Sequence, residues 1–338
     1  MSQLAKRLTP NGQKIPAYSE SEMRLVLSLT ADILSYRRCP RQYGFQAVRG
    51  YAPARATQEF VGTFAHRSLD RAFRKYLETQ RAPSNAQMAD ILAEVKELLR
   101  EQKRRPHRWE VVDHIGLRIM RLNRSFDTYG VFKRIVDTER TLQTDDEDFV
   151  IEGRVDVIQG GSMIELWDYK ATQDPRRLLL PPRRGRKISA FDRAAAQARI
   201  ADYTLQLRLY AHLHEVVYRE KPAACRLVFL NEIDVEAAKD TSWAEYDAEP
   251  IASEDWFQSE EDSTGTAPGL FFSVGIEKED LTQALREFRE TGRQILAARR
   301  KDEWLAPEEL PDTATCDACD FRYSCGPACK EHHYDKQL

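Results

Sequence analysis

The sequence lacks any run of about 18 consecutive apolar residues, so no segment is predicted to span a membrane. Its first residues, Met1–Pro16, are polar and lack the apolar segment and the small-residue cleavage site of a secretory signal. No P-loop of the form G-x4-G-K-[S/T] occurs, so we expect no helicase motor within the chain, and no internal repeat is present. From these absences we expect a cytoplasmic protein.

An overall basic excess is also missing, because the formal net charge at pH 7 is −3. Total charge alone therefore does not indicate a nucleic-acid partner. Basic side chains nevertheless gather in one acid-free stretch, which contains Arg176, Arg177, Arg183, Arg184, Arg186 and Lys187. A second basic run covers Lys103–Arg108, for which an ordinary solvated surface is equally expected.

Cysteines are few, but their distribution is uneven. The chain has 6 cysteines, and most of them follow residue 315. In a cytosolic protein this clustering favours a metal site over disulfides. The spacing C-x2-C-x5-C offers three ligands, Cys316, Cys319 and Cys325. The fourth ligand of a tetrahedral set would be the nearby Cys329 or the distant Cys39, whereas Cys225 lies in an apolar segment and is expected to be an inert core residue.

Hydrophobic periodicity divides the chain into a helical part and a mixed part. Before residue 130, apolar residues recur at helical spacing in Glu59–Leu77, Ala86–Gln102 and Val111–Tyr129. β-Branched and aromatic residues then predict strands at Phe132–Leu142, Phe149–Ile158, Met163–Ala171, Cys225–Ile233 and Leu270–Ile276. Further helices are predicted at Phe191–Tyr218 and Asp280–Arg300. The pattern indicates an α/β fold in which helices flank a small mixed sheet.

The same pattern suggests five regions along the chain. We expect a flexible N-terminus at 1–28, a helical region carrying Cys39 and His66 at 29–130, and a sheet-containing core at 131–234. An acidic, turn-rich and exposed insertion is expected at 235–268. A C-terminal strand, a charged amphipathic helix and the cysteine-rich tail make up 269–338.

Ionisable side chains interrupt two otherwise apolar strands of the core. Asp156 lies in IEGRVDVI (151–158), and Asp168 and Lys170 lie in ELWDYKA (165–171). Ionised groups in a buried strand cost several kcal/mol unless they are paired or bound to a metal. Two carboxylates suit a hard cation such as Mg²⁺ or Mn²⁺, and a neighbouring lysine can stabilise charge at phosphorus. This combination is typical of phosphodiester hydrolysis.

The turn between these strands decides whether the two aspartates meet. A two-residue turn at Gly160-Gly161 would pair Asp156 with Glu165 and place Asp168 on the opposite face. A shared metal instead requires a three-residue loop, a longer loop or a bulge. We predict the three-residue loop, Gly160–Ser162, with glycine in the left-handed position. The other interpretation is structural, with a salt bridge between Asp168 and Lys170 or between Asp156 and Arg154.

The motifs and their order resemble the PD-(D/E)XK nuclease superfamily. More narrowly, they resemble its RecB-like branch, which includes CRISPR-associated nucleases and the AddB nuclease domain. GRVDVI resembles the second motif of that branch, WDYKAT its third, and QLRLY its Q-x-x-x-Y signature. GTFAHRSLDRAF places a histidine at the position of the branch's N-terminal histidine, and Glu139 resembles a further acid on the first strand. The resemblance covers residues 30–233 and 316–325.

This resemblance implies roles for seven residues. His66, Asp156 and Asp168 would bind Mg²⁺ or Mn²⁺ together with the Tyr169 carbonyl, Lys170 would be the catalytic lysine, and Gln206 and Tyr210 would lie by the active site and touch the DNA strand. The spacing agrees in part, because Gln206 and Tyr210 are four residues apart and share a helix face. His66 shares its face with apolar residues, where a histidine alone would be interpreted as a core residue.

The cysteines also have a counterpart in the RecB-like branch. Some members hold an iron–sulfur cluster with one distant N-terminal cysteine and a C-terminal C-x2-C-x5-C trio. The Cys-Pro dipeptide at 39–40 resembles the first of these elements. The resemblance therefore implies a [4Fe–4S] cluster with a structural role, bound by Cys39, Cys316, Cys319 and Cys325. Four cysteines would also suit Zn²⁺, which remains the rival.

Taken together, the residues and the resemblance predict a Mg²⁺- or Mn²⁺-dependent DNA nuclease. We expect an exonuclease directed at single strands or free ends, with or without endonuclease activity, acting in repair, recombination or defence, with a separate helicase partner. The basic stretch Arg176–Lys187 directly follows the third strand and is expected to grip DNA phosphates. One alternative is an end-trimming nuclease of CRISPR adaptation with an integration partner. Another is a non-catalytic DNA-binding subunit of a helicase complex, against which the intact Asp156, Asp168 and Lys170 speak.

Overall fold

The computed structural model describes residues 24–51, 56–102, 106, 108–181, 188–261 and 267–306, together with residues 316, 319, 321 and 325 of the tail. Its centre is a mixed β-sheet in the strand order β1-β3-β4-β5-β6, with β2 paired to β3. The strands are β1 (Leu25–Ser28), β2 (Ile135–Asp145), β3 (Phe149–Gln159), β4 (Glu165–Lys170), β5 (Ala224–Phe229) and β6 (Phe271–Ser273). This mixed α/β architecture confirms the predicted fold class.

Two parallel pairs and three antiparallel pairs make up the sheet. β1 runs parallel to β3 and β4 parallel to β5, whereas β2 with β3, β3 with β4, and β5 with β6 are antiparallel. Strand β2 pairs with β3 along most of its length. On the other edge of β3, β1 pairs with Phe149–Glu152 and β4 with Val157–Gln159. Residues 153–156 of β3 therefore face a gap between β1 and β4.

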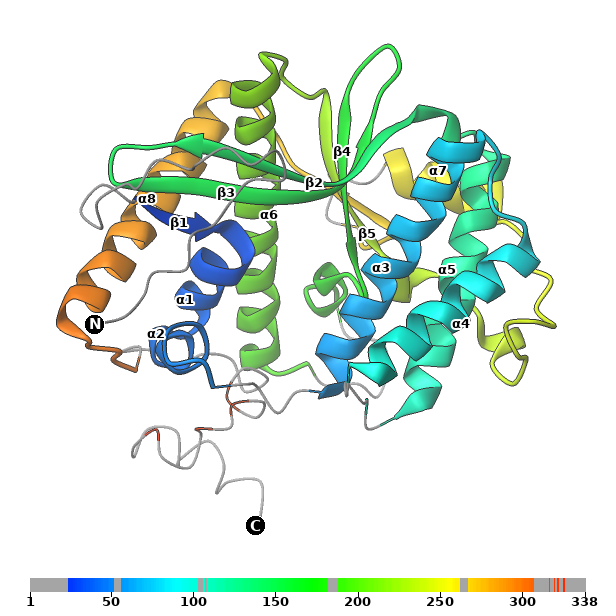
Figure 1. Cartoon of the computed structure of the whole chain (residues 1–338), viewed down its shortest axis with the longest axis horizontal. Coiled ribbons are helices and arrows are strands. Elements are labelled where there is room, and N and C mark those ends of the chain that lie inside the picture. Colours follow the sequence, from blue (N-terminus) through cyan, green and yellow to red (C-terminus); the bar gives the residue numbers. More distant parts are fainter. Residues whose placement is uncertain are drawn as a thin grey trace, which may run out of the picture.

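Helices cover both faces of the sheet (Figure 1). The helices are α1 (Ser35–Arg38), α2 (Pro40–Tyr43), α3 (Ala56–Thr79), α4 (Asn85–Glu101), α5 (Trp109–Thr128), α6 (Ala190–Tyr218), α7 (Ser253–Glu261) and α8 (Lys278–Lys301). Shorter 3-10 and π-helical segments are η1 (Leu29–Leu34), η2 (Gly44–Val48), η3 (Phe132–Arg134), η4 (Pro175–Leu178), η5 (Leu230–Glu232) and η6 (Glu236–Ala238). None of the described helices has both the length and the apolar composition to cross a lipid bilayer.

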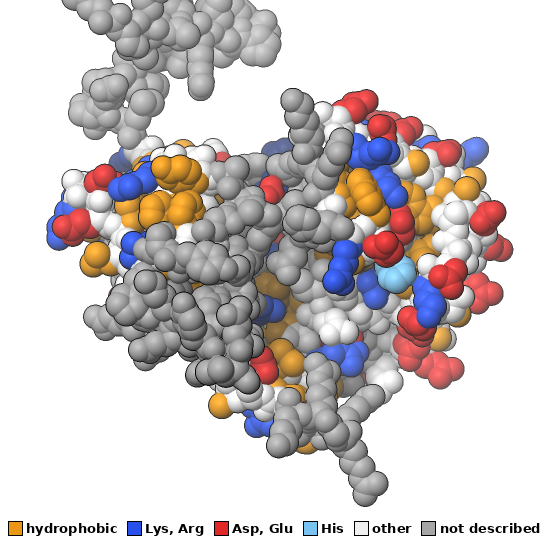
Figure 2. Space-filling model, turned by 90° about the horizontal axis from the view of Figure 1, so that it is seen from below, with side chains coloured by type: hydrophobic (Ala, Val, Ile, Leu, Met, Phe, Trp, Pro, Cys, Tyr) orange, Lys and Arg blue, Asp and Glu red, His pale blue; other side chains and the backbone are white. Residues whose placement is uncertain are grey.

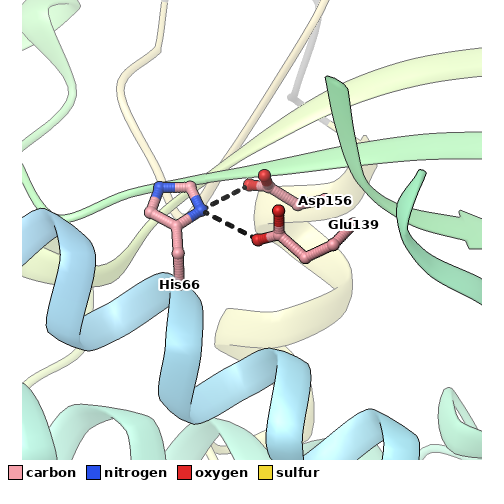
Figure 3. Close-up of side chains that lie close together, drawn as sticks. All are labelled: His66, Glu139 and Asp156. Atoms are coloured by element: carbon pink, nitrogen blue, oxygen red, sulfur yellow. Dashed lines mark ion pairs between the residues drawn. The ribbon is translucent and has the colours of Figure 1, made fainter. Parts of the chain in front are cut away.

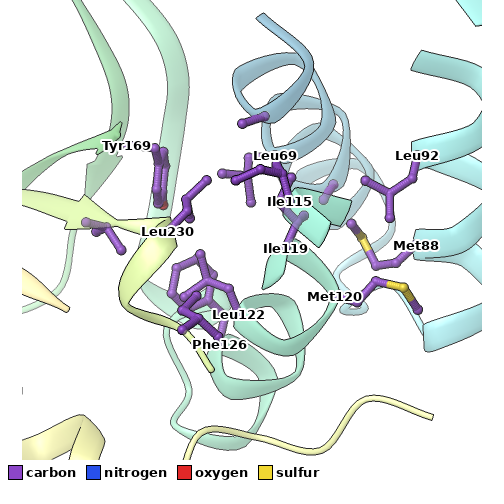
Figure 4. Close-up of a cluster of buried hydrophobic side chains, with 14 of the residues drawn as sticks. Leu69, Met88, Leu92, Ile115, Ile119, Met120, Leu122, Phe126, Tyr169 and Leu230 are labelled. Carbon is purple, nitrogen blue, oxygen red and sulfur yellow. The ribbon is translucent and has the colours of Figure 1, made fainter. Parts of the chain in front are cut away.

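Each face of the sheet has its own hydrophobic core. Helices α3, α4 and α5 pack on one face, where Leu69, Ile119 and Phe126 meet Tyr169 of β4 (Figure 4). Helices α6 and α8 pack on the other face with the η1 segment. Burial of each large apolar side chain contributes roughly 1.5–3 kcal/mol. The two cores hold β3 and β4 rigidly from both sides, which fixes the strands that carry the predicted acids.

Local sequence signals explain where α4 and α6 begin. Ser84 and Gln87 form a reciprocal capping box at the start of α4, and Ser189 and Asp192 form another at the start of α6. The predicted helix Phe191–Tyr218 is confirmed as α6. The expectation of loose structure up to residue 28 is wrong for Leu25–Ser28, which forms β1 because its apolar residues pair with β3 and bury Leu27. Residues 1–23 lie outside the described part.

Most described residues of the acidic region 235–268 are exposed, but a few large apolar side chains also pack on the core, which we did not predict. Trp256 of α7 is buried and packs edge-on against Phe126 and Phe271. Trp243 stacks on Phe64 of α3 with ring centroids 5.6 Å apart. Because acidic residues predominate in this region, the sequence analysis did not recognise the few large apolar side chains that attach it to the core formed by α3, α4 and α5. Residues 262–266 of the region lie outside the described part.

Candidate active site

The two predicted aspartates lie where β3 and β4 separate. The recorded pairing joins Val157 with Trp167 and Gln159 with Glu165, and extending this register by one residue places Asp156 opposite Asp168. The shared face that we predicted is therefore present. The loop that produces it has five residues, 160–164, so the predicted three-residue loop is wrong. Strand β4 begins at Glu165, two residues later than the predicted Met163, and the longer loop preserves the parity that a shared site requires.

Beyond this point β4 continues alongside β5 while β3 continues along β2 toward β1 (Figure 1). Helix α6 packs closely against β3 here, at Gly153. A Cβ atom on Gly153 would lie 2.7 Å from Cδ1 of Leu213 and 3.1 Å from Cε1 of Tyr210. Only glycine allows this approach without displacement of these two side chains. The glycine of the GRVDVI motif thus lets α6 bring its polar side chains to the gap in the sheet.

His66, Glu139 and Asp156 form a compact group of potential metal ligands (Figure 3). Their ligand atoms all lie within 4.8 Å of one another, and no other such group of three occurs among the described residues. His66 Nδ1 is 3.0 Å from Asp156 Oδ2 and 4.0 Å from Glu139 Oε1. Asp156 Oδ2 also accepts a hydrogen bond of 2.7 Å from the backbone N–H of Tyr169. Three different elements, α3, β2 and β3, therefore converge on one point.

Asp168 belongs to a second, adjoining group. The Lys170 ammonium lies 2.5 Å from Asp168 Oδ2. Gln206 donates a 2.8 Å hydrogen bond to Asp168 Oδ1, and Tyr210 donates to the same oxygen at 3.4 Å. Lys170, Gln206 and Tyr210, which the sequence predicted to lie by the same site, therefore all contact Asp168. Glu139, and not Asp168, completes the compact trio with His66 and Asp156. The predicted salt bridge between Asp168 and Lys170 also exists, so the metal-site and ion-pair interpretations are compatible.

Burial and mutual charge shift the pKa values of these groups. Burial lowers the pKa of His66, but the attraction and hydrogen bond of Asp156 outweigh it and raise the pKa to about 9. Burial and the nearby Asp156 carboxylate raise the pKa of Glu139 to about 7, against the opposing effect of Arg154. Burial also raises the pKa of Asp168, whereas His66 and Lys170 hold that of Asp156 below its usual value despite burial. A cation between these acids would relieve their repulsion.

The backbone at Glu139 is strained. Its φ of +51° lies in the left-handed region, which non-glycine residues seldom occupy, and it lies in β2 a few residues after the register shift between Ile135 and Asp137. Such a conformation costs of order 1–3 kcal/mol and persists only when the surroundings impose it. The strain directs the Glu139 side chain toward His66. The sequence suggested Glu139 only by resemblance, because no residue pattern reveals a left-handed residue inside a strand.

The donor set fits a divalent cation. One imidazole nitrogen and several carboxylate oxygens are the ligands that Mn²⁺ and Mg²⁺ accept, without the sulfur that softer metals prefer. Asp168 Oδ2 is buried and accepts no hydrogen bond of good geometry, even though the Lys170 ammonium is close. Buried oxygens without hydrogen bonds are costly in the absence of a cation. His66, Glu139 and Asp156 would hold the ion, with Asp168 at its edge.

The structure corrects part of the predicted DNA-binding loop. Arg176 is buried, pairs with Asp174 and donates a 2.7 Å hydrogen bond to the carbonyl of Phe271, so its predicted contact with DNA is wrong. This guanidinium instead anchors η4 to β6. Arg177 pairs with the buried Glu232 while remaining half-exposed. The other predicted phosphate contacts lie outside the described residues, namely Arg183, Arg184, Arg186 and Lys187.

The cysteine-rich tail lies against the segment that follows Cys39. Cys39 is buried between α1 and α2, and Cys316 is buried as well. Arg41 donates a 3.0 Å hydrogen bond to the carbonyl of Cys325, and the Phe321 ring stacks on Phe45 with centroids 4.1 Å apart. Cys325 and Phe321 of the tail therefore lie next to α2 and η2, the segments that follow Cys39. Cys329 lies outside the described residues, and Cys225 is buried in β5, where burial raises the pKa of its thiol.

Two further residues contact the site and were missed by the sequence analysis. The Lys170 ammonium lies 5.6 Å from the centroid of the Tyr203 ring. Tyr203 precedes Gln206 by three positions and Tyr210 by seven, so its place on the active face of α6 was available from helical spacing. Arg154 Nε lies 2.7 Å from Glu139 Oε2. We had considered Arg154 only as a partner for Asp156.

Sequence and structure comparisons relate these residues to known proteins. The profile of the PD-(D/E)XK nuclease superfamily matches residues 30–326. A candidate exonuclease from Eubacterium rectale has 14% identity and a TM-score of 0.46, with 88% of this chain and 89% of that chain covered. The protein SSO0001 has 12% identity and a TM-score of 0.32, with 92% and 89% covered. No curated protein matches in sequence.

The assignment rests on the family profile, since both structural similarities are distant. Its match spans most of the chain and includes His66, Glu139, Asp156, Asp168 and Lys170. The elements in between also have the α/β arrangement that places these side chains together. The chain therefore belongs to the PD-(D/E)XK nuclease superfamily, a group of phosphodiester hydrolases that use divalent metal ions.

Proposed function

We propose that this protein is a DNA exonuclease that acts on single strands with a free end and depends on Mg²⁺ or Mn²⁺. One observation carries the proposal: three acids, a histidine and a lysine from four elements converge where β3 and β4 separate. No packing requirement explains so many buried ionisable groups at one point of a sheet. The preference for single strands and ends follows the RecB-like resemblance of the motifs.

The residues would divide the work as follows. His66, Glu139 and Asp156 hold the cation, and Asp168 and the Tyr169 carbonyl approach it from β4. When bound, the cation would polarise the phosphate and supply a hydroxide nucleophile. Lys170 is kept protonated by Asp168, which raises its pKa against the effect of burial, so its ammonium can stabilise negative charge at the phosphate. Gln206 and Tyr210 hold Asp168 in position from α6.

Linear and circular substrates test the requirement for an end. We expect a labelled linear single strand to be degraded to short products in Mn²⁺, while a covalently closed circle of the same sequence persists, because an exonuclease must begin at a terminus. Product lengths on denaturing gels measure both reactions, with chelator as the control. Cleavage of the circle at the rate of the linear strand would contradict the exonuclease proposal. Cleavage in chelator would contradict the proposed dependence on Mg²⁺ or Mn²⁺.

We further propose that the cysteine tail binds a [4Fe–4S] cluster through Cys39, Cys316, Cys319 and Cys325. The burial of Cys39 and Cys316 and the contacts of Arg41 and Phe321 support a site shared by the segment around Cys39 and the described part of the tail. The role is structural, because a bound cluster would close a very long loop of the chain. A nuclease that processes ends beside a helicase or a CRISPR integration complex fits this architecture, with repair, recombination or defence as the setting.

An absorption spectrum tests the cluster. Protein purified without oxygen should show a broad visible charge-transfer band, and Cys39→Ser should lose this band, its iron and several degrees of melting temperature. Cys225→Ala is the matched control, since Cys225 is a buried cysteine of the sheet and should leave the band unchanged. A colourless wild-type protein that contains zinc would overturn the proposal. Retention of the band in Cys39→Ser would exclude Cys39 as a ligand.

A further inference from the structure

Arg154 is an exposed cation at the edge of the active site. It precedes Asp156 by two residues on β3, so both side chains project to the same side of the strand. Its side chain is 65% exposed, while that of Glu139 beside it is 14% exposed. The two oxygens of Glu139 face different groups, since Oε1 is 4.0 Å from His66 Nδ1 and Oε2 is 2.7 Å from Arg154 Nε. The strained Glu139 thus links the metal site to Arg154.

The negative charges of the site suggest a role for Arg154 in binding the DNA backbone. Glu139, Asp156 and Asp168 place three carboxylates around the gap, and a DNA phosphate must approach them against their repulsion. His66 is held by Asp156 and is 28% exposed, and Lys170 is held by Asp168 and is 19% exposed. In the described part of the chain, Arg154 is therefore the one partner cation of these acids that is mostly open to solvent.

The geometry of the guanidinium determines what it can bind. Nε lies 2.7 Å from Glu139 Oε2 as an ion pair without hydrogen-bond geometry, and the two Nη groups supply the remaining donors of the planar group. Such a planar group matches the oxygens of a phosphate and binds them bidentately, which the point charge of a lysine does not do. The ion pair with Glu139 keeps this guanidinium beside the metal-binding acids. Seen from below, basic and acidic side chains lie next to one another around a histidine on the surface (Figure 2).

We propose that Arg154 binds a backbone phosphate of the substrate strand next to the phosphate that is cut, while its ion pair with Glu139 keeps the guanidinium beside the metal site. The proposal rests on the nuclease function above and adds a positioning contact for the strand. Glu139 then serves both the cation and the strand, which gives a reason for its strained backbone. A purely structural Arg154 would only neutralise Glu139 and would not contact DNA.

Binding without cleavage tests this contact. The affinity of a labelled single-stranded oligonucleotide is measured by fluorescence anisotropy in chelator over a range of salt concentrations. Arg154→Gln should weaken binding about tenfold at low salt, as loss of one charge-assisted contact implies. It should also reduce the slope of log affinity against log salt by about 0.7, the value for one phosphate on a single strand. Arg154→Lys should keep the slope and lose part of the affinity.

Arg293→Gln is the matched control, because Arg293 is also an exposed arginine paired with acids, on the distant helix α8. It should retain wild-type affinity and slope. Melting temperatures of all variants show whether they are folded. Equal affinity and equal slope in wild type and Arg154→Gln would overturn the proposal, as would a wild-type protein that does not bind the strand at all.

Uncharged methylphosphonate linkages show which phosphate of the strand Arg154 contacts. In a series of oligonucleotides, each with one methylphosphonate, the wild type should be weakened strongly at one position near the site of cleavage. In Arg154→Gln this penalty should disappear while penalties elsewhere remain. An unchanged pattern of penalties would overturn the proposal. Because binding is measured without cleavage, failure of the nuclease function would show separately, as a wild type that binds strands with this pattern but does not cut them in Mn²⁺.

Discussion

Replacing Asp168 with asparagine is expected to lower the rate of single-strand cleavage by at least about a thousandfold, since loss of about 4 kcal/mol of metal-dependent stabilisation has this effect. The amide oxygen of asparagine can still accept the hydrogen bond of Gln206, so the shape of the site is retained. The charge that faces the cation and keeps Lys170 protonated is removed. Initial rates on a labelled linear oligonucleotide with saturating Mn²⁺ measure the effect.

The matched control for this substitution is Asp113→Asn. Asp113 also pairs with a lysine, Lys96, at 2.7 Å, but it lies on α5 outside the site. This variant should cleave at close to the wild-type rate, which separates loss of an ion pair from loss of the active-site carboxylate. If Asp168→Asn were folded and retained more than about a tenth of the wild-type rate, a metal-assisted role for Asp168 would be untenable. A non-catalytic DNA-binding subunit would instead show no metal-dependent cleavage in either the wild type or the variant.

Deprotonation of His66 alone is expected to raise the affinity for Mn²⁺ roughly fiftyfold between pH 7 and pH 9. His66 has a pKa of about 9, so the imidazole is mostly protonated at pH 7, and the proton must leave before the ring can bind a cation. At pH 9 about half of the rings are already neutral, and the competition with protons is nearly gone. Isothermal titration in oxygen-free buffers at several pH values measures this dependence.

The stability of the metal-free protein should change with pH in the opposite direction. Since the folded state raises the pKa of His66, this group stabilises the fold below about pH 6.5 and loses its contribution as the pH rises through about 9. Glu139, whose pKa is about 7, likewise loses a favourable contribution between about pH 4.5 and pH 7. The melting temperature in chelator should therefore fall as the pH rises.

His66→Gln isolates the responsible group. The variant should bind Mn²⁺ more weakly at pH 9 and lose most of the rise in affinity, since glutamine does not titrate. His214→Gln is the control: His214 is buried on α6 and contacts the carbonyl of Glu220, away from the acids, so its replacement should leave the pH profile unchanged. A wild-type affinity that is constant between pH 7 and pH 9 would contradict the assignment of His66 as a ligand.

Much of this site was readable from local spacing in the sequence. Asp168 and Lys170 are two apart on a strand, and Gln206 and Tyr210 are four apart on a helix, so each pair had to share a face. The structure places all four residues in contact. Periodicity likewise predicted α3, α4 and α5, because those helices bury regular apolar stripes. Short-range patterns were sufficient wherever one element alone determined the geometry.

Features that depend on distant contacts were not predictable in this way. Strand β1 forms because Leu25–Ser28 pairs with β3, which lies more than a hundred residues later in the sequence. Four residues without a neighbouring turn signal do not predict such pairing. The side chain of Trp256 is buried and attaches the acidic segment to the core, which the composition of the segment does not predict. Arg176 looked like a DNA contact because its charge was visible, whereas its buried partner Asp174 and the carbonyl of Phe271 depend on the tertiary fold.

Helix α6 follows β4 and precedes β5 in the sequence, and this order has a consequence for protein synthesis. A nascent chain that has emerged only as far as residue 175 already contains His66, Glu139, Asp156, Asp168 and Lys170. It still lacks the helix that holds Asp168 and the strand that pairs in parallel with β4. We therefore expect the ribosome-bound chain to have no cutting activity until about residue 230 has left the exit tunnel, so the cell's nucleic acids are not exposed to a half-made enzyme.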